Sequence, residues 1–289
     1  MTSTTALTLR DARFRAALAA FDAGDEAALR RVLAEHPGLG AERLEEPGAW
    51  LREQVGEALD GYFRRPFLLW FAAGNPVRGG RLPPNAASLA AILIEAARRD
   101  DAEGLRDQLE HTLELVASGR VARESGVQIA LLDVLIDAGA RPGDGLAALG
   151  AGHLQAAAHL LERGGTLGLA GALCLGRFDE APRLAAGASA GERQDALIAA
   201  AVNARPDAQA WLLAFGVDVD ARGSGIHPHA TALHQAVAAG CLPAVQRLVE
   251  AGARLDVRDT VHRGTPLDWA RYAGQAQIAS YLEAAGERR

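Results

Sequence analysis

Residues 231–257 read TALHQAVAAGCLPAVQRLVEAGARLDV, and residues 265–286 read TPLDWARYAGQAQIASYLEAAG. The two stretches share one pattern, and their first residues, Thr231 and Thr265, stand 34 positions apart. Self-similarity at a period of this length is typical of proteins built from stacked structural repeats. The pattern therefore predicts a repeat protein.

Each repeat has the signature of two short helices. Thr231 and Thr265 can cap the first turn, and Pro266 costs little there because the N–H that it lacks would have no helical partner. Gly240 is expected to end the first helix in the left-handed conformation that glycine adopts most easily. Apolar residues at helical spacing then mark each second helix, and these are Val245, Leu248, Val249, Ile278, Tyr281 and Leu282.

The TALH tetrapeptide, the helix-ending Gly240 and the apolar second helix resemble the ankyrin-repeat family, in its bacterial form. Residues 146–165 and 196–220 match the same pattern, and residues 169–188 match it more loosely. The resemblance implies an all-α solenoid of about eight stacked helix pairs, with short β-hairpin fingers mainly after residues 216 and 252. The expected second helices are marked by apolar residues at Leu33, Ile94, Ile136, Leu161, Ala185, Leu213, Val249 and Leu282.

The N-terminal half follows the pattern less closely. We predict a single ankyrin-repeat domain, 1–289, made of an N-terminal capping repeat (1–37), irregular repeats with inserted loops (38–143) and more regular repeats (144–286). The inserted loops are expected at residues 75–87 and 119–127, and WLREQVGEAL within the irregular part is a candidate for an extra helix.

Composition favours helices and excludes some functions. Hydrophobic residues make up 49% of the chain but aromatic residues only 5%, which suits closely packed helices better than a sheet. The net charge of −6 is spread evenly with no basic stripe, so nucleic acid is not an expected partner. No long apolar run or export signal is found, so we expect no membrane association and a cytoplasmic location. Cys174 and Cys241 fit buried thiols in a reducing compartment.

The sequence contains few candidate catalytic or ligand-binding motifs. No Ser-His-Asp arrangement, Cys-His pair or phosphate-binding loop stands in a suitable context, so no catalytic residue and no cofactor are expected, and the chain is not expected to be an enzyme. His227, His229 and His262 lie in neighbouring fingers and could surround a metal, which leaves a metal- or small-ligand-dependent regulator as an alternative, with an enzyme less favoured still. The resemblance assigns His234 a structural role, in which its imidazole bonds neighbouring loop backbone.

A solenoid of helix pairs exposes a concave face made of first helices and fingers, and binding is its natural function. The resemblance therefore implies a protein–protein interaction scaffold whose partner is another, unidentified protein. Of the four tryptophans, we expect Trp50, Trp70 and Trp211 in the core and Trp269 near the concave face. The predicted partner-binding residues are Arg222, His227, His229, Gln235, Ala239, Arg258, His262, Arg263, Trp269 and Tyr272.

Overall fold

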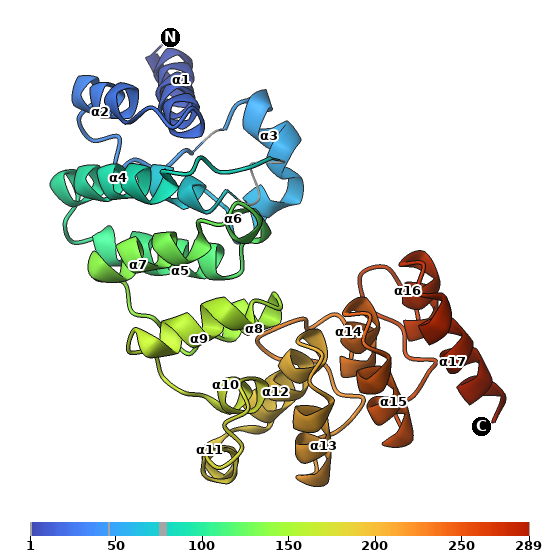
Figure 1. The fold of residues 1–289 in the computed structure, drawn as a ribbon. Helices are drawn as coiled ribbons and strands as arrows, with labels where there is room; N and C mark the ends of the chain where they lie inside the picture. Colours follow the sequence, from blue (N-terminus) through green and yellow to red (C-terminus); the bar gives the residue numbers. More distant parts are fainter. Residues whose placement is uncertain (1, 46, 75–79, 289) are drawn as a thin grey trace. The chain divides into compact units, whose positions relative to one another are not determined.

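The structure is a computed structural model that describes residues 2–45, 47–74 and 80–288. The chain divides into two compact units, Met1–Pro142 and Gly143–Arg289. Both are built from helices (Figure 1), and the described residues contain no β-strand, as expected of an all-α protein. Among the described residues, none of the helices has the length and apolar composition of a membrane-spanning segment.

The first unit is an array of helices of unequal length. Helix α1 packs on α2, α2 on α4, and α4 and α5 both on α7. The elements are α1 (Thr2–Asp22), α2 (Glu26–Glu35), α3 (Ala49–Val55), the 3-10 helices η1 (Gly56–Asp60) and η2 (Leu68–Ala73), α4 (Ala86–Asp100), α5 (Leu105–Ala117), α6 (Arg120–Glu124) and α7 (Gln128–Asp137).

These bounds bear on three sequence expectations for this unit. The segment WLREQVGEAL does form helix, as α3 and η1. The expected loop at residues 119–127 instead contains α6, whose buried Val121 and Ala122 give that turn a reason to fold. The other expected loop, 75–87, falls partly outside the described residues; its part from residue 86 onward begins α4.

An aromatic cluster fills the core of the first unit. The rings of Phe63 and Phe71 lie 5.1 Å apart in an edge-to-face arrangement, and Phe63 and Trp70 lie 6.0 Å apart. Trp70 is buried, as expected. Trp50 is only half-buried, because its indole N–H donates to the Asp11 carboxylate at 2.8 Å and holds the ring near the surface.

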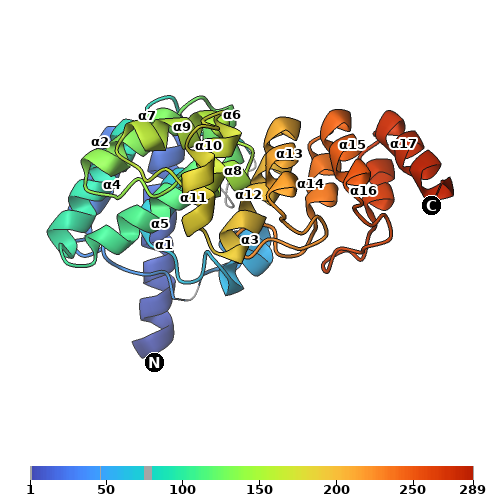
Figure 2. The same ribbon diagram turned by 90° about the horizontal axis from the view of Figure 1, so that it is seen from below.

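The second unit is a two-layer stack of short helix pairs. The pairs are α8 (Leu146–Gly150) with α9 (Leu154–Glu162), α10 (Leu169–Cys174) with α11 (Ala181–Gly187), α12 (Ala190–Val202) with α13 (Pro206–Ala214), α14 (Ala232–Ala238) with α15 (Leu242–Glu250), and α16 (Pro266–Tyr272) with α17 (Ala276–Glu287). First helices pack on first helices throughout this unit, and among the second helices α13 packs on α15 and α15 on α17; Figure 2 shows α12 to α17 in these two rows.

The predicted helix ends of the second unit are present. The Thr265 hydroxyl accepts from the Asp268 N–H at 3.2 Å and Pro266 opens α16, while Gly240 ends α14 with φ +67°. Small residues let the first helices approach one another, since Ala236 and Ala270 are both fully buried.

Candidate partner-binding face

Two long loops extend from the first-helix row of the second unit. We call residues 217–230 the first finger loop and residues 253–264 the second finger loop. Neither forms strands; a single antiparallel β-bridge between Arg222 and Thr231 closes the first, so the expected β-hairpins are reduced to one bridge. The Thr260 N–H donates to the His229 carbonyl at 2.9 Å and joins the two loops.

Asp259 organises the second finger loop. Its side chain is buried, and its carboxylate accepts hydrogen bonds from the backbone N–H groups of Val261 (2.9 Å), His262 (2.6 Å) and Gly264 (2.8 Å), and from the Trp269 indole N–H at 3.0 Å. Burial alone would raise the pKa of Asp259, but these four donors outweigh it and hold the pKa far below its usual range. The carboxylate is therefore ionised and fixes the loop to α16.

Asp195 of α12 organises the first finger loop in a similar way. Its carboxylate accepts from the N–H and hydroxyl of Ser224 at 2.7 and 2.8 Å and from the Gly225 N–H at 2.9 Å. A side chain at Gly223 would meet the Ile226 carbonyl oxygen at 1.9 Å, so this tight turn requires glycine. The loop is thus bound to a helix about 30 residues earlier in the chain.

The expected structural role of His234 is confirmed. The imidazole is fully buried, its Nδ1 lies 2.8 Å from the Thr231 hydroxyl, and its Nε2 lies 3.2 Å from the Gly264 carbonyl oxygen. Burial lowers the pKa of His234 despite the hydrogen bond to Gly264, so the ring is held neutral in the core of the repeat.

His227 and His229 form a row of rings with Trp269 rather than a metal cage. The rings of His227 and His229 lie 5.7 Å apart, those of His229 and Trp269 lie 6.2 Å apart, and His227 Nε2 is 2.7 Å from the Gly150 carbonyl oxygen. In the described part of the chain no three His, Cys, Asp or Glu side chains are placed to hold a metal ion. The geometry therefore offers no support for the metal-dependent alternative.

The predicted contact residues differ in exposure. Tyr272 is 96% exposed, and Arg222, Ala239, Arg258, His262 and Arg263 are also exposed. His227, His229 and Trp269 are half-buried, since the first is bound to Gly150 and the indole N–H of Trp269 is bound to Asp259. Gln235 was predicted to contact the partner from its position in the repeat, but its side chain is only 5% exposed, because α14 buries residues 232–237 between its neighbours.

Three arginines form a row across the two finger loops. The Arg222 guanidinium donates to the Arg258 carbonyl at 2.9 Å, and the Arg258 guanidinium donates to the Arg263 carbonyl at 2.7 Å. Arg258 also lies 3.7 Å from the Asp268 carboxylate. Within the described residues, no carboxylate lies within 4.0 Å of the guanidinium groups of Arg222 and Arg263. Backbone carbonyls thus hold the Arg222 and Arg258 guanidinium groups in place, whereas Arg263 takes part in the row through its carbonyl oxygen.

This region also carries an exposed apolar residue that the repeat pattern did not predict. Val261 stands near the tip of the second finger loop and is 62% exposed. Val261 is exposed because Asp259 imposes a turn on this loop. The only local sign of that turn in the sequence is an Asp followed by a short, mostly polar stretch.

The comparison with protein families agrees with the second unit. Residues 197–287 match the family model described as ankyrin repeats in three copies. This match supports an ankyrin-repeat protein, and repeats of this kind generally mediate protein–protein interactions. The curated proteins contain no match to the chain.

Proposed function

We propose that this chain is a protein–protein interaction scaffold that binds another protein through its two finger loops and the exposed ends of α14 and α16. The observation that carries the proposal is the arginine row, in which Arg222 and Arg258 are anchored on backbone carbonyls, accompanied by exposed Val261 and Tyr272. Fixed guanidinium groups beside exposed apolar side chains are the composition of interface centres, where Arg and aromatic residues contribute most of the affinity.

The contact set follows from exposure. Arg222, Ala239, Arg258, His262, Arg263 and Tyr272 are retained, and Val261 is added. Trp269 and His229 contribute indirectly, because their stacked rings support the loops that carry the arginines. Burial of Gln235 removes that residue from the set.

From the resemblance and the composition we further propose that the first unit, too, is built of ankyrin-type helix pairs, so that the chain holds about eight pairs in a single domain, 1–289, of the bacterial type. The chain acts in the cytoplasm without a cofactor, does not catalyse a reaction, and binds neither nucleic acid nor membranes.

Charge reversal tests the proposed face. The tagged chain is used to recover partners from its source cells, and recovery by the Arg258→Glu, Arg263→Glu double variant is compared with recovery by wild type using quantitative mass spectrometry. The matched control is Arg177→Glu, Arg247→Glu, which changes charge equally at residues paired to Glu180 and Glu250 outside the finger loops.

The expected result is loss of the specific partner by the finger variant alone, with unchanged melting temperatures for both variants. Equal recovery by wild type and the finger variant would contradict the proposal. Equal loss by both variants would show that net charge, and not this face, governs binding.

A further inference from the structure

A cleft opens in the second unit among α8, α10, α11 and α12, before the first finger loop. Its volume is about 370 Å³, at the low end of the range for ligand pockets, which suits one large side chain with adjoining backbone. The cleft exists because the connections before α10 and α12 are short, so no finger covers this part of the first-helix row.

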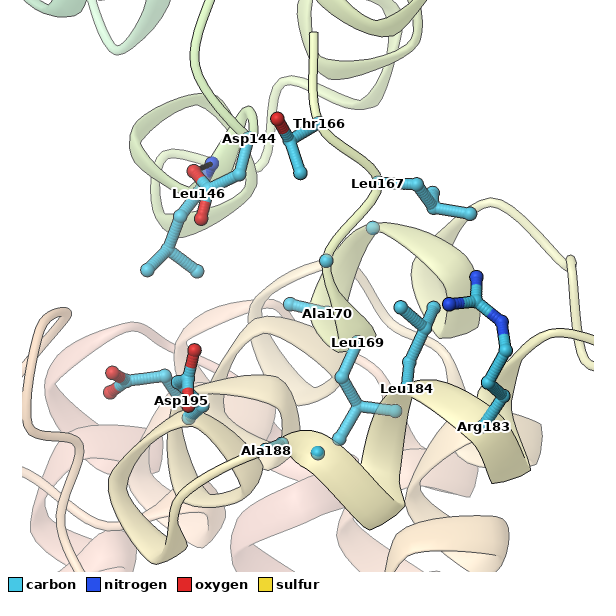
Figure 3. Close-up of a pocket in the computed structure, with 14 residues that line it drawn as sticks. Asp144, Leu146, Thr166, Leu167, Leu169, Ala170, Arg183, Leu184, Ala188 and Asp195 are labelled. Atoms are coloured by element: carbon cyan, nitrogen blue, oxygen red, sulfur yellow. Dashed lines mark hydrogen bonds between the residues drawn. The ribbon is translucent and has the colours of Figure 1, made fainter.

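Leucines line the cleft on several sides. Leu169 forms its floor and is buried, whereas Leu146, Leu167 and Leu184 are half-buried and present apolar surface to it. Figure 3 shows Leu146 and Leu184 on opposite sides with Leu169 between them. Side chains of this kind favour an apolar occupant, because each gains from the removal of apolar surface from water.

The lining is predominantly acidic. Among the described lining residues there are three carboxylates, Asp144, Glu192 and Asp195, and one guanidinium, Arg183. In Figure 3 Asp144 and Asp195 lie on the side opposite Arg183. Glu192 stands three residues before Asp195 on α12 and so shares its helix face, which makes this end of the cleft suited to a cation.

Two of the carboxylates are available to such a cation. Asp195 is buried and satisfied by the first finger loop, but Asp144 and Glu192 are exposed. The Asp144 carboxylate accepts only the Leu146 N–H, at 3.0 Å, among the described residues. Hydrogen bonds from Ser189 lower the pKa of Glu192, so this carboxylate is charged at neutral pH.

We infer that the cleft binds an apolar side chain flanked by a basic residue in a protein segment, as a site separate from the arginine row. The occupant is specified by charge complementarity: leucines for its apolar side chain, and Asp144 and Glu192 for its cation. The inference rests on the proposed function in taking the ligand to be part of a protein. Asp195 lines the cleft and also holds Ser224, so the cleft adjoins the first finger loop, and one extended partner segment can reach both.

Defined peptides test the site without knowledge of the partner. A short capped peptide with a central Leu-Arg-Leu is titrated into the full-length, isotope-labelled chain, and the amide signals of Leu146, Leu167, Gly171 and Leu184 are followed by NMR. The same peptide with Leu-Glu-Leu at its centre is the ligand control. Saturable shifts at the cleft with the basic peptide alone are expected.

The variant Asp144→Asn, Glu192→Gln removes both charges but keeps an acceptor for the Leu146 and Ser189 N–H groups. It should weaken binding of the basic peptide about fivefold. The matched control Asp25→Asn, Glu250→Gln makes the same changes outside the cleft and the finger loops, and Asp25 likewise accepts a backbone N–H, that of Ala28, at 2.8 Å. This control should bind as wild type does.

The apolar half of the site is tested by Leu184→Arg, which places a cation where the leucine stands and should abolish the shifts; should this variant fail to fold, the charge variants decide alone. No saturable shift at the cleft, equal binding of both peptides, or unchanged affinity of Asp144→Asn, Glu192→Gln would overturn the inference. None of these results depends on the arginine row, whose role is tested separately by Arg258→Glu, Arg263→Glu.

Discussion

Replacing Asp259 by alanine should destabilise the second unit more than any other single change in the finger loops. The carboxylate accepts four hydrogen bonds at 2.6 to 3.0 Å, and its loss leaves three backbone N–H groups and the Trp269 indole without their acceptor. Such bonds contribute roughly 0.5–1 kcal/mol each where water can reach the vacated donors. The free energy of unfolding should therefore fall by about 2–4 kcal/mol.

The pH dependence provides a second readout of the same interaction. Because the folded-state pKa of Asp259 lies below the ordinary value of 3.8, its contribution is fully present above that value and is lost as the pH falls through the folded-state pKa. The difference in unfolding free energy between wild type and Asp259→Ala should stay constant from about pH 8 to pH 5 and shrink below about pH 4.

Urea denaturation at several pH values measures both quantities. Asp256→Ala is the matched control, because Asp256 lies in the same loop but is exposed and pairs with Arg254 at 3.0 Å. A loss for Asp259→Ala no larger than that for Asp256→Ala, or a difference that does not change with pH, would refute the assigned role of Asp259.

Three further changes have expected outcomes. Gly240→Val should lower the free energy of unfolding by about 1–2 kcal/mol, because valine is strained at φ +67°, and an unchanged thermal midpoint would exclude this conformation. Gly223→Ala should release the first finger loop, seen as faster hydrogen exchange at Ser224 and Gly225, because the added carbon would meet the Ile226 carbonyl; unaltered exchange would contradict the tight turn. Tyr272→Ala should change stability by less than about 0.5 kcal/mol yet weaken partner binding, because its ring is 96% exposed; a large loss of stability would mean that the ring is packed.

The regular repeats could be predicted from sequence because their determinants are local. Thr265, Pro266 and Gly240 each act within one helix turn, so their spacing alone locates α14 and α16. The anchoring of the finger loops could not be predicted in this way. Asp195 binds Ser224 across 29 residues, and nothing in the residues between them marks the two as partners.

Helix faces explain where the prediction of core residues failed. Trp211 adjoins Leu212, and an apolar run suggested that both are buried. The buried residues of α13 are Ala208, Gln209 and Leu212, whereas Trp211 is only half-buried and stacks on Phe215, one turn later, at 5.3 Å and 9°. Composition identified an apolar helix but could not assign its face, because apolar residues occur on both sides.

The most direct test of the proposed partner face is a hydrogen-exchange footprint of the full chain with and without the partner recovered in the charge-reversal experiment. We expect slower exchange in both finger loops, 217–230 and 253–264, and at the end of α16, with no change along α13, α15 and α17. Protection confined to these second helices, with both finger loops exchanging as in the free protein, would contradict the proposal that this chain binds its partner through the finger face.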